Sequence, residues 1–188
     1  MLKYIEEFGK HVAIAGFRNA KIKDLEEFLK IMRKEKPANV EIQFFDAKSV
    51  ATWQHLYFAV LDALTAFKNE ENISKSLTME TMLYASVQRQ IRKAMTLLGI
   101  KSNSSEIAVL IIGEKLELIR LALSFVSKHV KAKRDDAVLG LSKEKIADIQ
   151  KVFVISDVEL ETVMKKDCLE KTLTDLVIER MALLATQH

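Results

Sequence analysis

Apolar and polar positions follow two different periods along the chain, which predicts both strands and helices. Residues 11–17 form a short apolar run, residues 40–46 alternate apolar with polar side chains, and residues 107–112 are all apolar. Alternation is typical of a half-buried strand, and a short continuous run is typical of a strand covered on one or both faces. These three segments are therefore predicted to form a small sheet.

The segments between these strands carry apolar residues at helical spacing. The helix that follows residue 22 is closed by Pro37, the only proline. The next helix contains residues 53–64 and is expected to begin at a cap, either Asp46 or Ser49. Residues 114–130 are apolar nearly all round, which predicts a central and largely buried helix.

Capping residues place the remaining helices. One continuous helix is expected from its cap at Thr78 to Leu98, where a glycine follows. Ser156 is followed three residues later by Glu159, which fits a capping box. Two more helices are expected to begin at Ser142 and to run from Asp167 to Ala185.

These elements predict a mixed α/β (α+β) fold with a small central sheet surrounded by about seven helices. One proline and five glycines leave little room for a flexible hinge, so residues 1–188 are expected to form a single domain. Hydrophobic residues make up 49% and charged residues 29%, which favours a globular, soluble chain. No apolar stretch approaches the length of a membrane span, and no signal peptide is expected at the N-terminus.

Candidate chemistry is sparse. The four histidines lack metal-ligand spacing, and an isolated pair such as Asp135 and Asp136 makes a poor cation site. The single cysteine, Cys168, excludes an internal disulfide and suggests a reducing cytoplasm. Phosphate-binding and nucleophile motifs are absent, and Gly113, between a strand and a helix, is weak support for an anion site. We therefore expect no enzyme activity, no cofactor and no metal.

Two surfaces stand out instead. The net charge of +3 is too small to indicate nucleic-acid binding by itself, so any RNA contact must come from local clustering. The helix of residues 78–98 has such a cluster on its polar face, which is either a solvated surface or a track for phosphates and exposed bases. The last helix is apolar around much of its circumference, so it either crosses the core or presents one side to a partner.

The order of segments resembles a known family. The helix "LTMETMLYASVQRQIRKAMTLLGI", the turn "KSNSSE", the strand "IAVLII" and the final "IERMALL" are similar to the kinase-binding regulatory subunit (Cgi-type) of the KEOPS complex, called PRPK-binding protein in animals. The resemblance is densest over Ser74–Ile112 and Asp175–Leu184. The "RQI" of residues 89–91 is similar to archaeal members, whereas animal members have asparagines there.

The resemblance implies a non-catalytic subunit of the cytoplasmic assembly that makes threonylcarbamoyladenosine in transfer RNA. Such a subunit binds and supports a kinase-like ATPase and helps to recruit transfer RNA through its single-stranded CCA end. The RNA-binding candidates are Lys75, Gln88, Arg89, Gln90, Arg92 and Lys93. The kinase-binding candidates are Leu173, Val177, Ile178, Met181 and Leu184.

Two alternatives remain open. One is a small-molecule-binding α/β enzyme with a site near Gly113. The other is a structural subunit that binds only protein. Salt-dependent binding of transfer RNA separates the first interpretation from both, because phosphate binding releases counterions.

Overall fold

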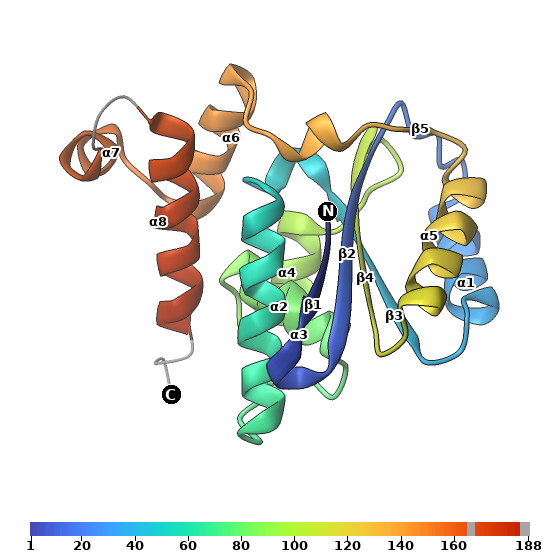
Figure 1. Cartoon of the computed structure of the whole chain (residues 1–188). Coiled ribbons are helices and arrows are strands. Elements are labelled where there is room, and N and C mark those ends of the chain that lie inside the picture. Colours follow the sequence, from blue (N-terminus) through green and yellow to red (C-terminus); the bar gives the residue numbers. More distant parts are fainter. Residues whose placement is uncertain (165–167, 185–188) are drawn as a thin grey trace. The chain divides into compact units, whose positions relative to one another are not determined.

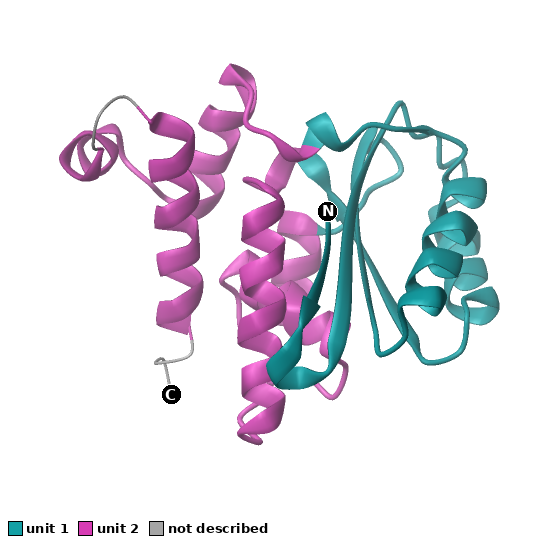
Figure 2. Cartoon of the chain, viewed as in Figure 1, with its two compact units in different colours: residues 1–47, 99–138 teal, residues 48–98, 139–188 magenta. Residues whose placement is uncertain are grey.

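The computed structural model describes residues 1–164 and 168–184. These residues form eight α-helices and a five-stranded antiparallel sheet (Figure 1), which confirms the mixed α/β class. The chain divides into two compact units, each made of two stretches of sequence (Figure 2): residues 1–47 with 99–138, and residues 48–98 with 139–188. The single-domain expectation stays a prediction.

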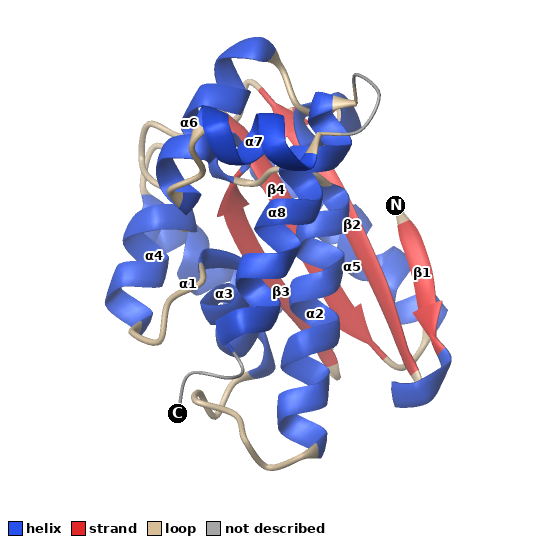
Figure 3. Cartoon of the chain, turned by 90° about the vertical axis from the view of Figure 1, so that its left-hand side faces the viewer, coloured by secondary structure: helices blue, strands red, loops and turns tan. Residues whose placement is uncertain are grey.

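The first unit contains the sheet, whose strand order is β1-β2-β4-β3 (Figure 3). Strand β5 pairs with the end of β2. The three strands predicted from the pattern are confirmed as β2, β3 and β4. Strands β1 and β5 were not predicted because they are short and almost entirely exposed, so neither shows an apolar period. The bounds are β1 (Leu2–Ile5), β2 (Lys10–Arg18), β3 (Val40–Asp46), β4 (Glu106–Gly113) and β5 (Lys133–Arg134).

Two helices, α1 (Leu25–Glu35) and α5 (Leu116–Val130), cover one face of this sheet (Figure 1). Register makes that face apolar, because Ala15 of β2 and Phe44 of β3 both lie opposite Val109 of β4. These three side chains are buried in one cluster with side chains of both helices. The sheet and its two helices therefore share one hydrophobic core.

The expectation that the helix over residues 114–130 is central and largely buried is wrong. Helix α5 buries a single stripe, and the Leu121 side chain is 57% exposed. The stripe follows the spacing of three and four residues that one helix face requires. The buried residues are Ile119, Ala122, Val126 and Val130.

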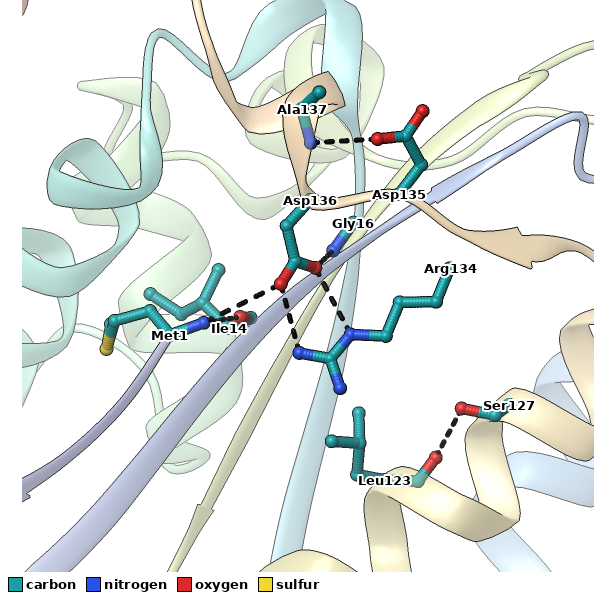
Figure 4. A network of polar contacts seen from close by, with 9 residues as sticks. All are labelled: Met1, Ile14, Gly16, Leu123, Ser127, Arg134, Asp135, Asp136 and Ala137. Atoms are coloured by element: carbon teal, nitrogen blue, oxygen red, sulfur yellow. Dashed lines mark hydrogen bonds and ion pairs between the residues drawn. The ribbon is translucent and has the colours of Figure 1, made fainter.

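A polar network fastens the segment after β5 to β2 (Figure 4). The carboxylate of Asp136 accepts hydrogen bonds from the Gly16 N–H at 2.9 Å and from the Arg134 guanidinium at 3.0 Å. A Cβ at Gly16 would lie 2.6 Å from the carbonyl oxygen of Asp135, so the close approach requires glycine here. Asp135 itself pairs with Arg18, at 2.7 Å between Oδ2 and Nε, so both acids are structural.

The second unit is helical. Helix α2 packs against α3 and α8, and α8 also packs against α6 and α7. Ser142 and Ser156 cap α6 and α7 as predicted, whereas neither Asp46 nor Ser49 caps α2, which follows Thr52 without a side-chain cap. The bounds are α2 (Trp53–Lys68), α3 (Leu77–Ser86), α4 (Ile91–Leu98), α6 (Lys143–Phe153), α7 (Asp157–Val163) and α8 (Leu169–Leu184), with single-turn helices η1 (Glu6–Phe8), η2 (Ala47–Ser49) and η3 (Asp136–Leu139) elsewhere. The expected ends of the last helix, Asp167 and Ala185, lie outside the described residues.

His55 joins three parts of this unit. Its Nδ1 accepts a hydrogen bond from the Ala51 N–H at 3.1 Å, so its Nε2 carries the proton and donates to the Ala85 carbonyl at 2.8 Å. Its ring also stands edge-on to that of Phe153, with centroids 5.3 Å apart. Burial lowers the pKa of His55 to about 4, so the neutral form belongs to the fold.

Within the described ranges, no helix is long and apolar enough to cross a membrane.

Candidate functional site

The predicted continuous helix over residues 78–98 is wrong, because the chain breaks between α3 and α4. Val87 adopts a left-handed conformation with φ of 53°, and its N–H donates to the Tyr84 carbonyl at 2.9 Å. The Gln88 N–H donates to the Leu83 carbonyl at 3.0 Å, so the last carbonyls of α3 are satisfied and the helix ends there. Apolar residues continue at helical spacing across the break, and a valine gives no sequence signal for a left-handed position.

The start of α3 also differs from the expectation. Ser76, and not Thr78, is the cap: its hydroxyl accepts from the Met79 N–H at 3.4 Å. Glu80 is fully buried, and its carboxylate accepts hydrogen bonds from the N–H groups of Ile73 at 3.0 Å and of Ser74 at 2.6 Å. No pattern in the sequence indicates this role of Glu80, which fixes the loop that carries Lys75.

Most of the predicted RNA-binding side chains lie between α3 and α4 or at the start of α4. Arg89 and Gln90 lie between the two helices, and Arg92 and Lys93 lie in the first turn of α4; all four are exposed. The Gln90 carbonyl accepts from the Ala94 N–H at 3.0 Å, which places Gln90 at the helix start. We call residues 88–93 the basic link.

Ile91 does not point into the core, because its side chain is 48% exposed. The break resets the helical phase, so α4 buries Ala94 and Leu98, one turn apart, and turns Ile91 outward. An exposed isoleucine therefore lies between the polar residues of the basic link.

The electrostatics of α4 are unusual. The first turn of a helix carries the positive end of its dipole, so cations there are unfavourable and anions are favourable. Arg92 and Lys93 occupy that turn, the turn has no acid, and neither side chain has an ion pair with any residue that the structure describes. This arrangement favours an anion bound from outside.

A hollow of about 330 Å³ adjoins these two cations. Lys75 lies before the other end of α3, a helix of ten residues that spans roughly 15 Å. The structure thus brings Gln88, Arg92 and Lys93 together, places Arg89 and Gln90 in the same link, and sets Lys75 apart. The hollow is lined by Gln88, Arg92, Lys93, Thr96 and Leu97.

The predicted kinase-binding residues, all on α8, form two groups that differ in burial. Leu173, Val177, Met181 and Leu184 are buried, whereas Ile178 is partly exposed. Next to this set, the Leu183 side chain is 49% exposed. Ile178 and Leu183 are therefore two apolar side chains that α8 offers to a partner without unpacking.

Arg180 connects α8 to the end of α6 and to the first turn of α7. Its Nη2 donates to both carboxylate oxygens of Glu159, at 2.8 and 2.9 Å, and its Nε donates to the Phe153 carbonyl at 3.1 Å. The Ser156 hydroxyl accepts from the Glu159 N–H at 3.1 Å, as a capping box requires. The Glu159 carboxylate binds Arg180 instead, a contact that sequence spacing gave no means to predict.

Gly113, near which the alternative enzyme site was expected, is tightly packed. A Cβ at Gly113 would lie 3.2 Å from both the Asn39 carbonyl oxygen and the Ile119 Cδ1. The space that a side chain would need is therefore already taken by the backbone of Asn39 and the side chain of Ile119. The Glu114 carboxylate follows the end of β4 and pairs with Lys10 at 2.8 Å. A negative charge therefore lies where the alternative would place an anion. In the part of the chain that the structure describes, no group of three or more His, Cys, Asp or Glu residues could hold a metal ion.

Comparisons with known proteins agree on one family. The family described as "Kinase binding protein CGI-121" matches residues 17–185. A curated relative, "Regulatory protein Cgi121" of Methanocaldococcus jannaschii, is 32% identical over 116 residues, which cover 62% of this chain and 72% of the relative. The family match spans most of the chain, including the basic link and α8. This chain therefore belongs to the CGI-121 family of kinase-binding proteins.

Proposed function

We propose that this chain is a non-catalytic regulatory subunit of the KEOPS complex, the cytoplasmic assembly that forms threonylcarbamoyladenosine in transfer RNA. In that role it binds and supports the kinase-like ATPase subunit, and it helps to recruit transfer RNA through the single-stranded 3′ CCA end. Membership of a kinase-binding family supports the protein–protein part of the proposal.

The observation that supports the RNA part is the pair of cations in the first turn of α4. Arg92 and Lys93 are exposed, unpaired among the described residues, and placed where the helix dipole already repels positive charge. A phosphate at this position gains from both side chains and from the unsatisfied N–H groups of the helix start. Gln88 and Gln90 add amide groups that hydrogen-bond the edges of unpaired bases.

The experiment for the RNA part is a titration of the isolated protein with transfer RNA at several salt concentrations. The observed binding constant should fall linearly with salt concentration on logarithmic axes, because each phosphate contact releases counterions. Binding that is absent, or that does not change with salt, contradicts this part and favours a subunit that binds only protein.

We assign the contact with the kinase-like ATPase to the exposed side of α8. Ile178 and Leu183 supply apolar side chains there, and Lys171 and Asp175 pair with each other at 2.8 Å. The buried members of the predicted set, such as Val177, support this surface from beneath. Purification of the tagged chain from its native organism tests the assignment, since a kinase-like ATPase should accompany it.

A further inference from the structure

A second hollow lies in the first unit, between the start of α1 and the end of α5. Its volume is about 480 Å³, within the range of about 300–1,000 Å³ that ligand sites occupy. Three lysines line it from two distant parts of the sequence: Lys21 and Lys23 precede α1, and Lys131 follows α5. We call this cavity the lysine hollow.

The positive charge of the lysine hollow is not compensated within the described residues. The side chains of Lys21, Lys23 and Lys131 are exposed, and none of them forms an ion pair or a hydrogen bond with any residue that the structure describes. The segment of residues 128–133, which contains Lys131, has two further lysines and no acid. An anion that enters the hollow therefore meets several free ammonium groups.

Two acids also line the lysine hollow, and both have other partners. The Asp24 carboxylate caps α1, since it accepts a hydrogen bond from the Glu27 N–H at 2.9 Å. The Glu27 carboxylate pairs with Lys30 at 3.3 Å. Neither acid pairs with a lysine of the hollow, so the three ammonium groups stay available to a ligand.

Helix dipoles explain only part of this arrangement. Lys131 follows the last turn of α5, where the negative end of the dipole attracts cations. Lys21 and Lys23 instead precede the start of α1, where the positive end of the dipole repels cations and attracts anions. These two lysines gain nothing from the dipole of α1, whereas a bound anion gains from them and from the helix start.

The wall of the hollow suits a nucleotide. Ile22 and Phe28 line the hollow with buried apolar side chains, along which lysine stems pack while the ammonium groups stay in water. His129 is half-buried, and its Nδ1 donates to the Phe125 carbonyl at 2.9 Å, which fixes the ring. Ammonium groups bind phosphates as point charges, and histidine rings stack on unpaired bases.

We propose that the lysine hollow is a second contact for transfer RNA, which holds the phosphate backbone outside the CCA end. This inference rests on the proposed RNA binding. It extends that function because it assigns an RNA contact to the first unit, whereas the basic link belongs to the second unit. The two contacts should then respond differently to the removal of the CCA end.

The test titrates the full chain with intact transfer RNA and with the same RNA lacking its CCA end, at several salt concentrations. The variant Lys21→Gln/Lys23→Gln should weaken the binding of both RNAs by one common factor. It should also reduce the salt slope by about two units, one for each lost phosphate contact. Lys93→Glu, in the basic link, should weaken the binding of intact transfer RNA more than that of the trimmed RNA.

Two further variants serve as controls. Arg33→Gln/Lys34→Gln removes two exposed cations from the other end of α1, outside the hollow, and should leave the affinity and the salt slope nearly unchanged. Glu27→Gln removes an acid from the hollow and should tighten the binding of both RNAs. Tighter binding cannot arise from loss of structure, and thermal unfolding verifies that each variant is folded.

The outcomes separate this inference from the proposed function. If Lys93→Glu weakens binding and Lys21→Gln/Lys23→Gln does not, the proposed function stands and the second contact is wrong. If Lys21→Gln/Lys23→Gln weakens only the binding of intact transfer RNA, the hollow holds the CCA end instead. If it binds RNA like the parent but no longer co-purifies with a partner protein, the hollow binds an acidic protein segment. If the parent binds no transfer RNA, the proposed function itself fails.

Discussion

Val154 adopts a backbone conformation that valine rarely tolerates. It ends α6 with φ of 54°, and its side chain is 82% exposed. A β-branched side chain crowds the backbone in this left-handed region, which costs about 1–3 kcal/mol, whereas glycine adopts the region freely. Little hydrophobic burial offsets this cost because the side chain is in water.

Val154→Gly should therefore raise the free energy of unfolding by about 1 kcal/mol, measured by urea denaturation. The matched control is Val158→Gly, an equally apolar and exposed position within α7. Glycine in place of valine inside a helix should lower the stability by about 0.3–0.5 kcal/mol, because valine is itself a weak helix former. Destabilisation of similar size in both variants would show that Val154 is not strained.

His55 should make the stability depend on pH below neutrality. Its pKa is about 4 in the folded chain, below the ordinary value of 6.5 in the unfolded chain. Between these two values the unfolded chain binds more protons, so acid favours unfolding. The stability contribution is complete above about pH 6.5 and should fall by about 3 kcal/mol by pH 4, since one pKa unit corresponds to about 1.4 kcal/mol.

Denaturant unfolding between pH 4 and 7 measures this dependence, with His55→Gln as the comparison. The variant is expected to be less stable at pH 7 and to show a shallower slope, because it has no imidazole to protonate. A parent and variant with parallel pH profiles would exclude His55 as the source.

The strands could be predicted because their apolar and polar positions follow a regular pattern along the chain. The break between α3 and α4 could not be predicted in this way. Strand β3 alternates and β4 is apolar over residues 107–112, so each pattern indicates its own environment. In contrast, Val87 continues the apolar spacing of α3 although it ends that helix. The types of the predicted RNA-binding side chains came from the sequence, but the position of Arg92 and Lys93 at a helix start depends on that break.

Charge reversal in α4 should move stability and RNA affinity in opposite directions. Arg92→Glu places an acid at the positive end of the helix dipole, which should stabilise the fold by about 0.3–1 kcal/mol. The same change should weaken RNA binding and reduce the salt slope by about one unit, because a phosphate contact is lost. The measurements are urea denaturation and RNA titration on the same preparation.

Lys151→Glu is the control, since Lys151 is an exposed cation on α6 of the same unit. It should leave RNA affinity nearly unchanged. If Arg92→Glu is stabilised but binds RNA like the parent, the first turn of α4 is solvated surface.

Substitutions on α8 should separate surface from core. Ile178→Glu changes a partly exposed position and should abolish kinase association while the chain stays folded, since interface anchors contribute about 1–4 kcal/mol. Met181→Glu buries a charge at a fully buried position and should unfold the unit. Co-purification and circular dichroism distinguish the two, and a folded Ile178→Glu chain with unchanged kinase affinity would place the interface elsewhere.

Both candidate surfaces belong to the same compact unit. The basic link and α8 lie within residues 48–98 and 139–188, and α3, which the basic link follows, packs against α8. The sheet unit contains none of the predicted RNA-binding or kinase-binding residues. We therefore propose that one helical unit carries both surfaces. The core of this unit includes Leu173 and Val177.

The most direct measurement compares full-length transfer RNA with the same molecule lacking its CCA end. Each is titrated at several salt concentrations with the parent, Lys93→Glu and Lys151→Glu. We predict that removal of the CCA end weakens binding to the parent and to Lys151→Glu, and that Lys93→Glu binds both RNAs weakly with a shallower salt slope. Equal binding of both RNAs by the parent, or binding of intact transfer RNA by Lys93→Glu as tight as that of the parent, would contradict the account.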